Sequence, residues 1–107
     1  MQDEVDNIFV HDEIIQYIVE LVNKTRNHER ISLGGSPRAS ISLIQMAKAC
    51  AYLNQRDYVI PQDIQDIFYY VMNHRILLKN VKREEENNVK VEVLNSILND
   101  TKKPKLR

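Results

Sequence analysis

A cation occupies an unusual place in this sequence, at the predicted start of a helix. Ser36 has the hydroxyl of an N-cap residue, and Pro37 suits the first helical position because its φ is helical and it has no N–H. Arg38 follows in the first turn, where the positive end of the helix dipole disfavours a cation by about 0.3–1 kcal/mol. Free amides, the dipole and a guanidinium would converge on one point. A phosphate would satisfy all three, so we expect Ser36, Pro37 and above all Arg38 to form an anion site.

A purely structural function for Arg38 remains open at this stage. The arginine could form an ion pair with a nearby acid such as Glu29 and belong to the scaffold. A ligand-directed arginine would instead be exposed and would have no buried carboxylate partner. The position of the side chain therefore separates the two alternatives.

Other residue types that support catalysis or metal binding do not form a recognisable pattern. Gly34-Gly35 is only a weak phosphate signal, and no phosphate-binding loop of the G-x-x-x-x-G-K-[ST] type is present. The three histidines, His11, His28 and His74, fall on separate segments without ligand spacing, so surface or capping functions are favoured over a metal site. We therefore expect no catalytic residue, no metal site and no enzymatic activity in this chain alone.

The composition indicates a globular chain with no overall charge bias. The 107 residues include 15 Lys or Arg and 15 Asp or Glu, and this zero net charge argues against a nucleic-acid partner. No apolar run reaches membrane-spanning length. The single cysteine, Cys50, lies on a predicted apolar helix face and suggests a reducing compartment, so we expect a cytoplasmic protein. Four basic residues close the chain, as a frayed terminus or, less favoured, a binding arm: Lys102, Lys103, Lys105 and Arg107.

Four segments have the apolar periodicity of amphipathic helices. We expect helices over residues 11–28, from Pro37 to about Leu53, from Pro61 through Met72, and over residues 88–99. Asp63 is placed to favour the N-terminal amides of the third helix. The predicted core-facing side chains are Ile14, Ile15, Ile18, Val19, Leu21, Val22, Ala39, Leu43, Met46, Ala47, Cys50, Leu53, Ile64, Ile67, Phe68, Val71, Met72, Val93, Leu94, Ile97 and Leu98.

Two short β-branched or apolar segments precede the second and third helices. Residues 31–33 and 58–60 are expected to lie side by side as a minimal parallel pair. The charge run over residues 82–86 is expected to be a solvated loop or a helix extension. The predicted fold is therefore all-α, a bundle of about four helices with one very small strand pair. We expect a single domain over residues 1–107, with its core over about 5–77.

Four motifs, in this order and at these intervals, carry a resemblance to a known family. They are YIVELV followed by TR (residues 17–26), LGGSPRA (33–39), RDYVIP (56–61) and HRI (74–76). Together they resemble the C-terminal lid of MoxR-type AAA+ ATPases over roughly residues 5–77. The resemblance implies that the lid packs over ATP held, with its Mg²⁺, by an upstream ATPase domain that this chain lacks. It also implies that Arg38 is the "sensor 2" residue, which contacts the β- and γ-phosphates.

The same resemblance implies the partners of the longer protein. We expect a homo-oligomeric ring that couples ATP hydrolysis to chaperone-like remodelling, beside a von Willebrand factor A-type partner. For the family-typical Thr25-Arg26 and His74-Arg75, hydrogen bonding at helix ends is favoured over contacts within the ring. The alternative to a lid is a free-standing helical interaction module of histone-fold-like arrangement.

The chain departs from the family pattern at two capping positions. Gln55 replaces a glycine at the end of the second helix, so we expect Asn54 to take the left-handed conformation there. Ile60 replaces a Thr or Ser before Pro61 and offers no side-chain acceptor for helix amides. Neither departure affects Arg38.

Overall fold

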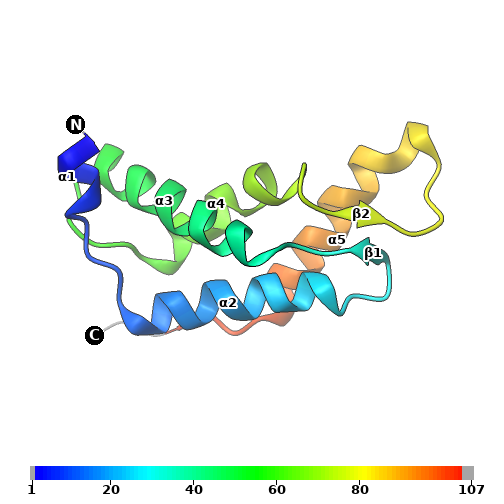
Figure 1. Ribbon diagram of the computed structural model, residues 1–107, viewed down its shortest axis with the longest axis horizontal. Helices are drawn as coiled ribbons and strands as arrows, with labels where there is room; N and C mark the ends of the chain where they lie inside the picture. Colours follow the sequence, from blue (N-terminus) through cyan, green and yellow to red (C-terminus); the bar gives the residue numbers. More distant parts are fainter. Residues whose placement is uncertain (1, 105–107) are drawn as a thin grey trace.

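The computed structural model describes residues 2–104 and shows a mostly helical fold (Figure 1). The elements, in chain order, are α1 (Gln2–Asp6), α2 (Asp12–Arg26), β1 (Ile31–Leu33), α3 (Pro37–Leu53), α4 (Pro61–Met72), β2 (Leu77–Leu78), the 3₁₀ helix η1 (Arg83–Glu85) and α5 (Glu86–Asp100). The all-α prediction is confirmed, and the four long helices occur where the periodicity places them. The short α1 is an element that the sequence pattern did not indicate.

One core lies between the four long helices. In Figure 1, α3 and α4 run above α2, and α5 lies behind; α2 contacts α3 and α5, while α4 contacts α3 and α5. Phe68, the largest fully buried side chain, lies at the centre of this packing. Among the predicted core-facing side chains, Val71 is half-buried, whereas the following are buried: Ile18, Leu21, Leu43, Ala47, Ile67 and Phe68.

The apolar faces of α2 and α3 are narrower than the sequence indicated. Met46 and Leu53, expected on the core face of α3, are exposed, as are Ile15 and Val19 on α2. Cys50 is half-buried. Each helix contacts its neighbours over only part of its circumference. Apolar side chains at the edges of a broad apolar face are therefore left in solvent.

The strand prediction was wrong in both partner and direction. β1 pairs antiparallel with β2, with Ile31 opposite Leu78 and Leu33 opposite Leu77. Tyr58 instead forms an isolated parallel bridge with Phe9, in which the Phe9 amide donates to Asp57 and the Val59 amide donates to Phe9. The backbone N–H and C=O groups of an extended segment need hydrogen-bond partners, and here those partners belong to segments that are distant in the sequence.

The C-terminal part of the chain is integral to the core. Val93, Leu94 and Ile97 of α5 are buried, as their predicted core-facing positions indicated. Part of the charge run forms η1, and α5 begins at Glu86, two residues before its predicted start. Of the basic tail, Lys102 and Lys103 are exposed; Lys105 and Arg107 lie outside the described residues.

Candidate functional site

The loop that leads into α3 is held tightly by the end of α2. The Thr25 hydroxyl is buried, accepts a hydrogen bond from the Gly35 amide at 2.9 Å and donates to the Val22 carbonyl at 2.6 Å. Arg26 Nε donates to the Gly35 carbonyl at 2.5 Å. A Cβ on Gly34 would lie 2.5 Å from the Arg26 Cα, so only glycine permits this approach. Thr25 and Arg26 therefore fix the position from which α3 starts.

The start of α3 is open to solvent. Ser36 is the N-cap residue and Pro37 occupies the first turn, as predicted, but the Ser36 hydroxyl makes no capping hydrogen bond. The Ser36 carbonyl accepts from the Ala39 amide at 2.9 Å. Pro37 has no N–H, so fewer free amides face solvent here than the sequence suggested. The guanidinium of Arg38 is the main anion-binding group that this helix start offers.

Arg38 is exposed and has no ion pair within the described residues. The proposed partner, Glu29, is also exposed and does not pair with it. No acid occurs in the first turn of α3, whereas α2, α4 and α5 each carry at least one. Arg38 thus has the exposure expected of a ligand-directed arginine and does not form the ion pair with Glu29.

The histidine and the arginine of the HRI motif differ in their contacts. His74 is exposed, and Arg75 Nη2 donates to the hydroxyl of Ser42 on α3 at 3.0 Å. The Arg75 amide also donates to the Met72 carbonyl at 2.9 Å, which closes the turn after α4. Arg75 thus lies across the same helix that carries Arg38.

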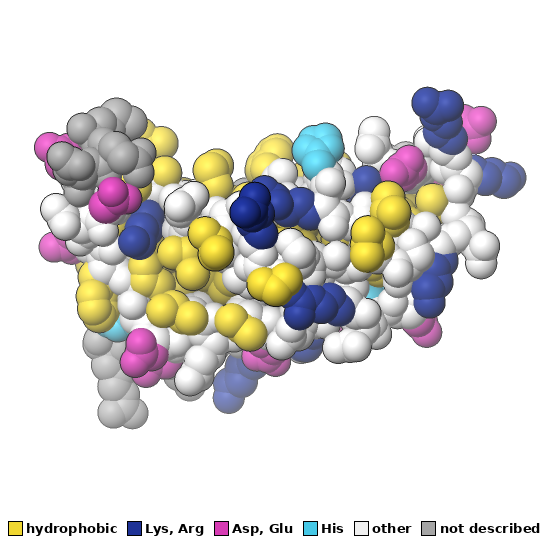
Figure 2. Space-filling model, viewed as in Figure 1, with side chains coloured by type: hydrophobic (Ala, Val, Ile, Leu, Met, Phe, Trp, Pro, Cys, Tyr) yellow, Lys and Arg dark blue, Asp and Glu magenta, His cyan; other side chains and the backbone are white. Residues whose placement is uncertain are grey.

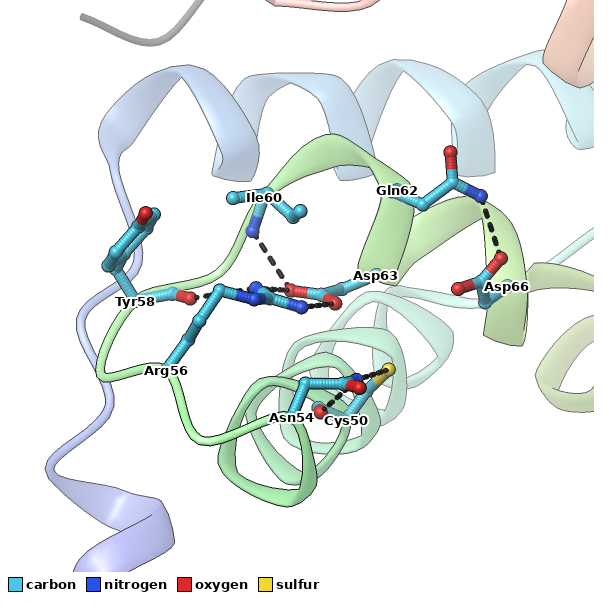
Figure 3. A network of polar contacts seen from close by, with 8 residues as sticks. All are labelled: Cys50, Asn54, Arg56, Tyr58, Ile60, Gln62, Asp63 and Asp66. Atoms are coloured by element: carbon cyan, nitrogen blue, oxygen red, sulfur yellow. Dashed lines mark hydrogen bonds and ion pairs between the residues drawn. The ribbon is translucent and has the colours of Figure 1, made fainter.

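The start of α4 is closed by a network that sequence reasoning identified only in part (Figure 3). Asp63 is buried, with its side chain 1% exposed, and accepts from Arg56 Nη1 at 2.7 Å and Nη2 at 2.6 Å. It also accepts from the Ile60 amide at 2.9 Å, which supplies the cap that the Ile60 side chain cannot. Asp63 was expected at the helix start, but its partner Arg56 was not. Nothing in the sequence indicates that Asp63 is buried, and it is this burial that requires a cation within reach.

This network changes the ionisation of its members. Burial of the Asp63 carboxyl opposes ionisation, but the hydrogen bonds from Arg56 and the Ile60 amide outweigh it, so the pKa of Asp63 lies below its ordinary value. The hydrogen bond to Asp63 raises the pKa of Arg56. Burial, followed by the neighbouring Asp63, raises the pKa of the Cys50 thiol, which favours the unreactive protonated form.

The end of α3 corrects the prediction for Asn54. Asn54 has a φ of −93°, and Gln55 itself takes the left-handed conformation, with a φ of 60°. The Gln55 amide donates to the Tyr52 carbonyl at 3.0 Å, and the Arg56 amide donates to the Ala51 carbonyl at 2.9 Å. This pair of hydrogen bonds is a Schellman motif, and the motif sets the conformation of its C′ residue whatever the side chain.

The histidines are dispersed, in agreement with their separate segments in the sequence. His11 makes edge-on ring contacts with Phe9 and Tyr58, and His28 Nδ1 accepts from the Arg30 amide at 3.1 Å. Among the described residues no group of three or more His, Cys, Asp or Glu side chains could hold a metal ion. No described helix has both the length and the apolar character needed to cross a bilayer.

Comparison with known proteins identifies the family. The model of the AAA lid domain family matches residues 23–97, most of the chain and both the open and the closed helix start. The chain belongs to this family. The lid is 32% identical over 115 residues to the chaperone MoxR1 of Mycobacterium tuberculosis (strain ATCC 25618 / H37Rv), a match that covers 99% of the lid and 30% of that protein. Together with the matches to the proteins MoxR of Paracoccus denitrificans and of Methylorubrum extorquens, this makes it the lid of a MoxR-type AAA+ ATPase.

Further relatives agree. The lid is 50% identical over 78 residues to the uncharacterised protein YeaC of Bacillus subtilis (strain 168), covering 73% of the lid and 24% of that protein. It is 46% identical over 50 residues to the protein MoxR of Paracoccus denitrificans, covering 46% of the lid and 15% of that protein. A crystal structure of a "putative ATPase" from Cytophaga hutchinsonii ATCC 33406 superposes with a TM-score of 0.83 at 33% identity, covering 96% of the lid and 34% of that chain. The lid thus spans between 15% and 34% of the length of these relatives.

Proposed function

We propose that this lid closes over ATP bound by an ATPase domain outside residues 1–107, and that Arg38 contacts the β- and γ-phosphates as the sensor 2 residue. The observation that supports this most directly is Arg38 itself, exposed in the first turn of α3 without a carboxylate partner among the described residues. In the free lid this cation faces the positive end of its own helix dipole. A phosphate would convert that unfavourable position into a favourable one.

The groups at the α3 start fit a triphosphate. A guanidinium offers a planar pair of N–H donors that matches two phosphate oxygens, and nothing among the described residues competes for it. The Thr25, Arg26 and Gly35 hydrogen bonds hold the helix start in place, so Arg38 is presented from a rigid base. No described cluster of acids could hold Mg²⁺. We therefore assign the metal to the ATPase domain as well.

Bound ATP supplies the phosphoanhydride that is hydrolysed, and the lid supplies charge. As negative charge builds on the γ-phosphoryl oxygens, a positioned guanidinium stabilises it without forming any covalent bond. Because Arg38 is on the lid, gain or loss of the γ-phosphate changes how strongly the lid is held to the ATPase domain. This is a direct route from hydrolysis to movement, and in the longer protein it would drive chaperone-like remodelling.

The name of one relative, chaperone MoxR1, supports that remodelling activity for the longer protein. We further propose that the longer protein forms a homo-oligomeric ring, acts in the cytoplasm, and works with a von Willebrand factor A-type partner. These proposals follow from the family and are independent of the geometry at Arg38.

The decisive experiment compares Arg38→Ala in the longer protein and in the isolated lid. In the longer protein, loss of a preorganised cation should reduce ATP turnover by about 10²–10³-fold. Arg38→Lys should restore little, because lysine lacks the planar fork. Arg83→Ala is the matched control: it removes an equally exposed arginine, on η1, and should leave turnover unchanged. Turnover in Arg38→Ala equal to that in Arg83→Ala would refute the proposal.

A further inference from the structure

A second arginine lies close to the α3 start, on a different helix. Arg75 follows the end of α4, and its Nη2 is 3.0 Å from the hydroxyl of Ser42. Ser42 is four residues after Arg38, so the two side chains lie on the same face of α3, about 5–6 Å apart at their Cβ atoms. The hydrogen bond from Arg75 therefore brings its guanidinium one helical turn from Arg38.

Neither arginine is neutralised by an acid. Among the described residues, no carboxylate forms an ion pair with Arg38 or Arg75, whereas Arg56 is paired with Asp63 and Arg30 with Glu92. Ser42 is an uncharged acceptor and engages one of the five N–H groups of Arg75. Two cations one helical turn apart without an ion-pair partner among the described residues repel each other, and a shared anion would remove that repulsion.

Arg75 borders a cavity whose lining combines basic and apolar side chains. A cavity of about 830 Å³ lies between α1, α3 and the end of α4, and its lining includes Ser42, Lys48, His74 and Arg75. Asp6 of α1 also lines it and has an interaction of its own. Figure 2 shows basic side chains gathered on the face over α3, with a histidine beside them and apolar side chains around them. The cavity leaves Arg75 accessible to a ligand on this side of α3.

We propose that Arg75 is a second cation for the anion that Arg38 contacts, held in place by the Ser42 hydroxyl. The inference rests on the proposed function, in which that anion is the triphosphate of ATP. Arg75 then contributes mainly to binding of the triphosphate. Its guanidinium approaches from the turn after α4 and lies one helical turn from Arg38 along α3. Ser42 is a positioning residue in this arrangement.

Steady-state ATP hydrolysis by the longer protein tests the assignment with four variants. Arg75→Ala should raise KM for ATP about tenfold or more, the effect expected for loss of a hydrogen bond to a charged group, with a smaller change in kcat. Arg75→Lys should recover part of the loss, because the charge remains. Ser42→Ala, which releases the guanidinium but keeps its charge, should raise KM by less than Arg75→Ala. Arg83→Ala is again the matched control and should leave KM unchanged.

The outcomes separate this inference from the proposed function. If Arg75→Ala matches Arg83→Ala while Arg38→Ala still strongly reduces turnover, Arg75 is not a nucleotide contact and only the present inference fails. If Ser42→Ala and Arg75→Ala give equal losses and Arg75→Lys restores nothing, Arg75 is only a brace between α3 and α4, which also overturns the inference. If Arg38→Ala has no effect either, the proposed function itself has failed. Thermal melts of the isolated lid should show Arg75→Ala within about 2 °C of the unchanged lid.

Discussion

The starts of α3 and α4 have the same local form and opposite surroundings. Each follows an extended residue and has proline in its first turn, at Pro37 and Pro61. At α4 the third residue is Asp63, buried and bound by Arg56, so charge and amides are satisfied within the fold. At α3 the second residue is Arg38, exposed and without an acid in the same turn.

The difference separates a helix start that stabilises the lid, at α4, from one whose cation is available to a ligand, at α3. A closed start stabilises the fold by satisfying its own donors, and nothing remains for a ligand. An open start with a cation is slightly unfavourable in isolation, and that cost is recovered only when an anion arrives. Mutation should therefore affect stability at α4 and ligand binding at α3.

The largest effect is expected from opening the closed start. Asp63→Ala leaves the Arg56 guanidinium half-buried without its partner and removes the cap of the Ile60 amide, so the free energy of unfolding should fall by about 2–4 kcal/mol. Urea denaturation of the isolated lid measures this. Asp66→Ala, which removes an exposed acid of the same helix, should change it by less than about 0.5 kcal/mol. Equal losses in the two variants would contradict the closed-start interpretation.

Low pH should weaken the same network at the start of α4 without any mutation, because Asp63 becomes protonated. The pKa of Asp63 is lower in the folded lid than in the unfolded chain, where it is about 3.9, so the unfolded chain binds the proton more readily. Its contribution to stability is complete above about pH 5 and is lost as pH falls through the unfolded and then the folded pKa. Stability measured between pH 6 and pH 2 should fall less steeply in Asp63→Asn than in the unchanged lid. Identical slopes would show that other carboxyls dominate.

Gln55, just after the end of α3, has a strained backbone conformation, and a substitution should relieve that strain. Its φ of 60° favours glycine, so Gln55→Gly should stabilise the isolated lid by about 0.5–1 kcal/mol, despite the larger entropy of glycine in the unfolded chain. Asn54→Gly is the matched control: its φ is −93° and its Nδ2 donates to the Cys50 carbonyl, so this change should destabilise. Thermal melts give the sign of both. Destabilisation by Gln55→Gly would argue against the Schellman cap at this position.

The smallest effect is expected at the open start. In the isolated lid, Arg38→Glu replaces a cation at the positive end of α3 by an anion and should raise stability by about 0.3–1 kcal/mol at low ionic strength. Added salt should reduce the gain. The same change in the longer protein should abolish ATP turnover, since a carboxylate repels phosphate. A loss of lid stability would instead show that Arg38 supports the fold.

Local features of this lid were predictable from the sequence. Helix periodicity depends on neighbours three and four residues apart, and proline restricts the first turn by its own ring, so the long helices and the starts at Pro37 and Pro61 were correct. The lack of an acid near Arg38 in the first turn of α3 is also a local feature that the sequence shows directly. The order and spacing of the motifs indicated the family without any knowledge of the fold.

Features that depend on distant segments were decided by the tertiary structure. The pairing of β1 with β2, the bridge between Phe9 and Tyr58 and the hydrogen bond from Arg75 to Ser42 join residues 33 or more positions apart, and nothing in a short segment selects among such partners. The left-handed Gln55 was missed because the backbone hydrogen bonds that end α3 outweighed the preference of the side chain. Sequence alone determined which helix start carried a charge without a nearby acid. Only packing determined that Asp63 would be closed by Arg56 while Arg38 stayed open, because burial depends on which elements come to lie above a residue.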